Sequence, residues 1–281
     1  MNVNSNFQDQ LIARAEQIMA QDGYQFSQLA GLSEMIDSST VPQLLQCVAE
    51  DISEETSAEK KPFLDQNYLY SKGDFNLSLV FCNGLGEPSD SHEVCANEFD
   101  LLLVNLGNQS IDIPVLQTKV DINHIYEMPV PAKNSPTVIL GPYHAHIFKA
   151  YNSVPLLDGI KQQACLLTAH SEARGPLTWT YNRETFQPTR LIATQVADSR
   201  SQLAASLIGE LSGSSKSIEC LEGVAKSDRY APFVRWEAFS SLCKLDEERG
   251  RSLLEAALVH DGDQYIRQLA DKTLMALSVS A

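Results

Sequence analysis

Residue types that bind metals are concentrated in one part of this chain. Five of the six histidines fall between residues 92 and 170. His144 and His146 alternate along a predicted strand, so both side chains are expected on one side of a sheet. Asp90 and His92 have the same spacing. Two imidazoles and one carboxylate that leave other positions of the ion open are typical of non-haem Fe(II) sites. The candidate metal ligands are therefore Asp90, His92 and one of His144 and His146, and the spacing does not decide between the last two.

The same spacing also has a plainer explanation. Two histidines separated by one residue occur often by chance, and a strand face that carries them can simply be exposed to solvent. On the residues alone, both interpretations stay open.

The residues before this cluster resemble a known family. The stretch 67–72, the strand-like run 75–82 and the turn that ends in Asp90 and His92 look like the first half of a cysteine-dioxygenase-like cupin. In that comparison Asp90 stands at the place of the first metal-binding histidine, and His92 matches the second. Lys72 falls where the family uses an arginine to hold the carboxylate of the substrate. Lysine cannot give the planar two-pronged grip of arginine.

The resemblance continues after residue 140. The run 141–146, Gly-Pro-Tyr-His-Ala-His, resembles the segment that bears the third metal-binding histidine. The run 164–171 resembles the strand that bears the active-site histidine and tyrosine of the family, but those two places hold Thr168 and His170. The resemblance implies Fe(II) or another divalent metal as cofactor, Lys72 as an anchor for an anionic substrate, and His170 as an acid, a base or a hydrogen-bond donor.

The elements that would position these residues are strands. From about 67 to 195 the apolar residues recur with a period of 2, and Gly, Pro, Asn and Asp fall between the runs. Short strands without helices among them indicate a β-sandwich or a β-barrel. The predicted strands are 67–71, 75–82, 99–105, 111–119, 137–149, 163–170, 176–181 and 188–194. Before them, residues 5–56 have a helical pattern.

The C-terminal region contains an internal repeat. Residues 234–238 match residues 266–270 at an offset of 32, with the arginines Arg235 and Arg267 in register. A period in this range indicates stacked helix pairs. The motif resembles a HEAT repeat over about 217–279. The two arginines are expected to pack or pair within the repeats.

The composition limits the classes of function. The net charge is −15 and the hydrophobic content is 43%. Such an acidic chain argues against nucleic acid and against an anionic membrane surface as partners. The start of the chain has no signal-peptide pattern, and no apolar run reaches the roughly 18 residues of a membrane span. The six cysteines lack metal-site spacing and are expected as free thiols of a cytoplasmic protein.

Together these patterns predict an α+β multidomain chain. The expected domains are an N-terminal helical segment over 1–58 that packs on the barrel, a cupin-like β-barrel over 59–195, and a helical HEAT-like region over 196–281. Two functions follow. The first is a metal-dependent oxygenase that acts on a small anionic or thiol substrate. The alternative is a non-catalytic, degenerate cupin whose HEAT-like repeats bind a protein partner.

Overall fold

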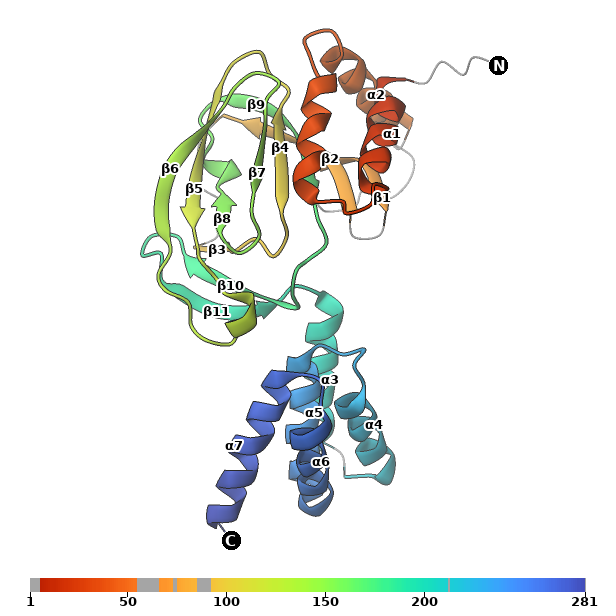
Figure 1. Ribbon diagram of the computed structural model, residues 1–281, viewed down its shortest axis with the longest axis vertical. Helices are drawn as coiled ribbons and strands as arrows, with labels where there is room; N and C mark the ends of the chain where they lie inside the picture. The colour runs from red at the N-terminus through yellow and green to blue at the C-terminus, as the bar shows by residue number, and fades with distance from the viewer. Residues whose placement is uncertain (1–5, 55–65, 73–74, 85–91, 212, 281) are drawn as a thin grey trace, which may run out of the picture. The chain divides into compact units, whose positions relative to one another are not determined.

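The computed structural model describes residues 6–54, 66–72, 75–84, 92–211 and 213–280. The chain divides into two compact units, Met1–Ile192 and Ala193–Ala281 (Figure 1). The first unit combines helices with β-sheets, and the second is helical, so the fold is of the α+β kind. None of the helices in the described residues combines the length and the apolar character that a membrane span needs.

The first unit begins with helices that cover one face of a sheet. They are α1 (Phe7–Met19), the 3-10 helix η1 (Phe26–Met35) and α2 (Val41–Glu54). The side chain of Asn6 caps α1 by accepting a hydrogen bond from the amide of Asp9 at 2.9 Å. The buried residues of α1 follow helical spacing; they are Phe7, Leu11, Ala15 and Ile18.

The strands of the described residues form three sheets, A, B and C, and all neighbouring strands of sheets A and C are antiparallel. Sheet A contains, in spatial order, β1 (Gln66–Lys72), β2 (Phe75–Asn83), β9 (Gln163–His170), β4 (Leu101–Asn105) and β7 (Ala145–Phe148). Sheet B contains β11 (Pro188–Ala193), β10 (Leu177–Asn182) and β3 (Glu93–Cys95). Sheet C contains β6 (Lys133–Leu140), β5 (Ile111–Gln117) and β8 (Ser153–Pro155). Two short 3-10 turns, η3 (Ile122–His124) and η4 (Leu157–Gly159), lie between strands.

Sheet A has a hydrophobic core on each side. Its outer face packs against the N-terminal helices through Leu77, Leu79, Leu102, Val104, Leu167 and Ala169. Its inner face, which carries Leu103 and Phe148, packs against Ile111, Ile113 and Leu140 of sheet C (Figure 1). Sheet A is therefore covered on both faces, and the side chains of its inner face lie between two sheets.

Two predictions about the strands need correction. The three sheets do not close into a barrel in the described residues. The predicted strand 137–149 is two strands, β6 and β7, separated by a turn in which Tyr143 has a φ of 59°. The reason is the pair Gly141-Pro142, because proline cannot donate to a strand ladder and Gly-Pro favours a turn.

The described residues of the second unit form five helices. They are α3 (Val196–Leu211), α4 (Ser215–Lys226), α5 (Pro232–Leu245), α6 (Glu247–His260) and α7 (Gln264–Ser280). The starts of α4 and α6 differ by 247 − 215 = 32 residues, and those of α5 and α7 by 264 − 232 = 32. The helices thus repeat with the period of the sequence, and matching residues such as Val234 and Ile266 are both fully buried.

The repeated arginines have structural contacts, as expected. Arg235 is 4% exposed and donates from Nε to the carbonyl oxygen of Ala225 at 3.0 Å. Its Nη atoms bind the carboxylate of Asp261. Arg267 donates to the carbonyl oxygen of the same Asp261. Arg235 therefore joins the end of α4 to the turn between α6 and α7.

The five cysteines whose side chains the structure describes are free thiols.

Two helical glycines give a matched test of this packing. A Cβ added at Gly209 of α3 would lie 2.6 Å from Cβ of Ser241 on α5, whereas one added at Gly223 of α4 meets nothing within 4 Å. Gly209→Ala should lower the free energy of unfolding by about 1–3 kcal/mol through overpacking. Gly223→Ala should raise it by about 0.5–1 kcal/mol through helix propensity. Urea unfolding measures both, and a stabilising Gly209→Ala would contradict the α3–α5 contact.

Candidate functional site

The inner face of sheet A carries the polar side chains that a site in this unit would use. The strand register places Ser78, Thr168, Leu103 and His146 in one row across β2, β9, β4 and β7. The next row contains Asn76, His170, Leu101 and Phe148. Polar groups thus lie between apolar neighbours, on the side that faces sheet C.

Thr168 is held by its neighbour on β2. Its hydroxyl oxygen lies 2.8 Å from the hydroxyl oxygen of Ser78 and also donates to the Ser78 carbonyl at 3.3 Å. Both residues are buried, at 5% and 3% exposure. Buried hydroxyl groups need such partners, because an unpaired one would cost about 1–3 kcal/mol. Thr168 is therefore a satisfied part of the core.

Both ring nitrogens of His170 have a hydrogen-bond partner. The amide Nδ2 of Asn76 donates to Nε2 at 3.1 Å, and Nδ1 lies 3.3 Å from the carbonyl oxygen of Ser171. A neutral ring with its hydrogen on Nδ1 satisfies both contacts. The ring of Phe99 lies 4.7 Å away, centre to centre. His170 would have to leave Asn76 before its Nε2 could act as an acid, a base or a ligand.

His146 lies on β7, directly opposite Leu103 of β4. Its ring meets Phe148 edge-on at 4.6 Å between ring centres. Burial lowers the pKa of the His146 imidazole. The side chain is therefore a neutral ring near neutral pH, in a largely apolar setting.

His144 does not share a strand with His146. It belongs to the turn before β7, where it is exposed, and its Nδ1 lies 2.7 Å from the carbonyl oxygen of Pro142. The expectation that the two histidines alternate along one strand is wrong, for the same reason that the strand 137–149 is broken. The turn fixes the ring of His144 against its own backbone.

The other predicted site residues lie elsewhere. His92 is exposed and lies immediately before β3 of sheet B, and its carbonyl oxygen accepts a hydrogen bond from the amide of Arg183 at 2.9 Å. Asp90 lies outside the described residues. Lys72, at the end of β1, contacts a carboxylate oxygen of Glu16 at 3.2 Å and is 71% exposed. The hydroxyl of Tyr70 donates to the same oxygen at 2.6 Å.

The structure thus brings two of the predicted residues onto one surface. His146 and His170 share the inner face of sheet A, with β4 between their strands. His92 lies next to a strand of sheet B instead. Among the described residues there is no group of three or more His, Cys, Asp or Glu side chains that could hold a metal ion. The predicted ligand set includes Asp90, which lies outside the described residues, so the metal site stays a prediction.

Asn76 and Ser78 of β2 were not predicted as part of a site. They are the hydrogen-bond partners of His170 and Thr168 on the inner face of sheet A. Both alternate with Leu77 and Leu79, which face the N-terminal helices. This alternation of polar and apolar residues is visible in the sequence, and it could have identified a polar inner face before the structure was known.

Comparison with known proteins leaves the family open. No family model matches the chain, and no curated protein does. Crystal structures of HppE are among the solved structures that match. The complex of Fe(II) HppE with substrate is 12% identical with a TM-score of 0.26, over 59% of this chain and 98% of that one. The complex of Co(II) HppE with Tris buffer is 11% identical with a TM-score of 0.23, over 61% and 100%. These values are too low to assign an activity to this chain.

Two histidines of this unit should have opposite effects on how the free energy of unfolding depends on pH. His146 has a lowered pKa, so the unfolded chain binds a proton that the folded chain does not, and stability is lost as the pH falls below about 6.5. The hydrogen bond from exposed His124 to Asp121 raises the pKa of His124, so its stabilisation is complete below about pH 6.5 and is lost as the pH rises through its folded pKa.

His146→Gln should therefore make the loss of unfolding free energy at acid pH shallower, and His124→Gln should make it steeper. Urea unfolding at a series of pH values between about 5 and 8 measures both slopes. A slope that stays the same or becomes steeper in His146→Gln would contradict the lowered pKa of His146, and one that becomes shallower in His124→Gln would contradict the raised pKa of His124.

Proposed function

We propose that this chain is a non-catalytic interaction protein. Its first unit is a divergent cupin-like fold that has lost a working metal centre, and its second unit is a HEAT-like module that binds a protein partner. The metal-dependent oxygenase is the competing function.

The inner face of sheet A supports the first part of the proposal. At the two places where the resemblance puts an active-site histidine and tyrosine, Thr168 bonds to Ser78 and His170 bonds to Asn76. Lys72, the expected anchor for a substrate anion, is next to Glu16. The groups that would act on a substrate are thus engaged with groups of the same chain.

The observation that carries the second part is a second apolar face on α3. The small residues Ala205 and Gly209 of α3 are buried in the helical unit, and Gly209 packs on Ser241. At 3.6 residues per turn, the opposite side of the helix presents an arc of about 80°. This arc contains Val196, Leu203, Leu207 and Leu211, which are between 47 and 80% exposed.

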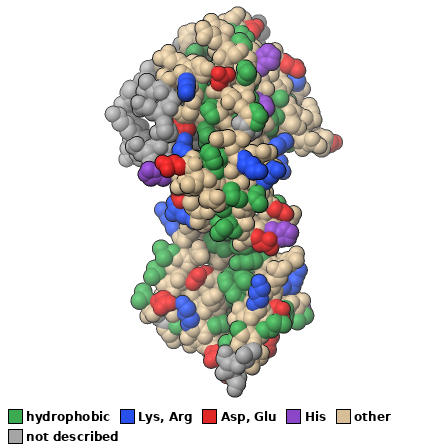
Figure 2. All heavy atoms as spheres, turned by 90° about the vertical axis from the view of Figure 1, so that its left-hand side faces the viewer, with side chains coloured by type: hydrophobic (Ala, Val, Ile, Leu, Met, Phe, Trp, Pro, Cys, Tyr) green, Lys and Arg blue, Asp and Glu red, His purple; other side chains and the backbone are tan. Residues whose placement is uncertain are grey.

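Such a stripe differs from scattered surface leucines. Aliphatic residues spaced by four and seven positions on one helix face are the anchors by which a helix enters an apolar groove of another protein. In the view of Figure 2, hydrophobic side chains reach the surface of the helical unit among charged ones. The partner is therefore expected to offer an apolar groove or helix face, and α3 is expected to fill it.

The test compares two sets of exposed positions. Leu203→Asp combined with Leu207→Asp places charge in the α3 stripe, and Val259→Asp places it on α6, where Val259 is 69% exposed. All of these side chains are exposed, so thermal unfolding should change little. The tagged chain is cross-linked to its partners in the cells that produce it. Partners recovered with the wild type should be absent with the α3 variant and present with Val259→Asp. Binding of the recovered partner should weaken at least about tenfold in the α3 variant.

Partners that bind the α3 variant as well as the wild type would contradict the proposal. Equal loss with Val259→Asp would also contradict it, because the effect would then come from charge anywhere on the helical unit.

A further inference from the structure

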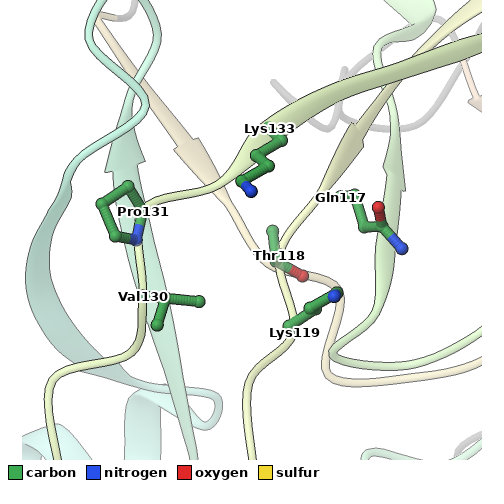
Figure 3. Close-up of a pocket in the computed structure, with 6 residues that line it drawn as sticks. All are labelled: Gln117, Thr118, Lys119, Val130, Pro131 and Lys133. Carbon is green, nitrogen blue, oxygen red and sulfur yellow. The ribbon is translucent and has the colours of Figure 1, made fainter.

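A second surface of the first unit has the features of a binding site. A pocket of about 300 Å³ lies where β5 ends and β6 begins. Its lining consists of Gln117, Thr118, Lys119, Val130, Pro131 and Lys133. In Figure 3, Val130 and Pro131 form one side, Thr118 and Lys119 form the other, and Lys133 reaches in from β6. The volume is at the lower end of the range for small-molecule sites.

The backbone on both sides of the pocket is fixed by hydrogen bonds. The Thr118 hydroxyl donates to the carbonyl oxygen of Tyr151 at 2.8 Å, and the amide of Val120 donates to the same oxygen at 2.9 Å. Across the pocket, the amide of Ala132 donates to the carbonyl oxygen of Phe186 at 2.8 Å. The pocket is therefore formed before a ligand arrives, which lowers the entropic cost of binding.

Lys119 is held in an unusual conformation. Its φ is 53°, in the left-handed region that a residue with a side chain seldom adopts. Strained residues of this kind persist where the surroundings hold them, and they cluster at ligand sites. The bonds of Thr118 and Val120 to Tyr151 hold this backbone in place, immediately before and after Lys119.

The pocket is lined by two lysines whose positive charges are not paired with a carboxylate of the described residues. Neither the Lys119 nor the Lys133 ammonium has an ion-pair partner in the parts of the chain that the structure describes. By contrast, Lys149 and Arg174 both contact the buried carboxylate of Asp100. Two unpaired cations at one pocket stand out in a chain with a net charge of −15. Their potential favours an anion at this place.

We propose that this pocket binds a small organic anion, with its acid group between Lys119 and Lys133 and its apolar part against Val130 and Pro131. Lysine binds such groups as a point charge, so carboxylates and phosphate esters share the required chemistry. The site uses none of the residues of the α3 stripe or of the inner face of sheet A. It stands whether or not the proposed function is correct.

The test uses a probe with both features of the proposed ligand. Hexanoate carries an acid group and an apolar chain, and hexanamide has the same chain without the charge. Saturation-transfer NMR should show saturable binding of hexanoate at about millimolar concentration and much weaker binding of hexanamide. Lys133→Gln and Lys119→Gln should each weaken the binding of hexanoate about tenfold or more. Inorganic phosphate should compete if the acid group alone directs binding, and butyl phosphate should compete if a phosphate ester fits as well as a carboxylate.

Two further variants separate binding from damage to the fold. Lys161→Gln removes another exposed lysine of the same unit, next to a different surface pocket, and should leave the binding of hexanoate unchanged. Lys119→Gly should lose binding as Lys119→Gln does, but it should unfold at a temperature no lower than the wild type, because glycine accepts the left-handed conformation. Absence of saturable binding, equal binding of hexanamide, or equal loss with Lys161→Gln would each overturn the proposal.

Discussion

The pairing of polar side chains between β2 and β9 is the constraint on which the account of the first unit depends. Sheet A has a hydrophobic core on each face, so a polar group that is fully buried on its inner face needs a partner within the protein. Ser78 with Thr168 and Asn76 with His170 meet this demand across the strand ladder. The pairs join β2 to β9 side chain to side chain, and they engage Thr168 and the Nε2 atom of His170 within the sheet. The two proposed binding surfaces, the lysine pocket and the α3 stripe, use none of the residues of this face.

The sequence predicted the parts of the fold that a simple periodicity determines. The strands β2 and β9 alternate clearly and were predicted within a residue of their ends. The 32-residue repeat predicted four helices whose starts have the same offset. Shorter elements were missed, because β3 and β8 have three residues each and show no period. The break between β6 and β7 was signalled by Gly141-Pro142, but the apolar residues on both sides suggested one strand.

The candidate site was harder to predict, for a physical reason. Spacing along the chain says which side chains share one strand, but not which strands become neighbours. His146 therefore came to lie in sheet A, whereas His92 lies just before a strand of sheet B, although each fits a motif. Lys119 and Lys133 are 133 − 119 = 14 residues apart and belong to no repeating pattern, so only the pairing of β5 with β6 reveals that they line one pocket.

The proposal that the first unit has lost its metal centre is tested most directly by adding Fe(II) to the purified chain without oxygen. The iron that stays with the protein after gel filtration is then counted for the wild type and for His92→Ala and His146→Ala. The proposed function predicts far less than one iron per chain and no difference among the three proteins. One iron per chain in the wild type, lost in either variant, would contradict the account and favour the metal-dependent oxygenase.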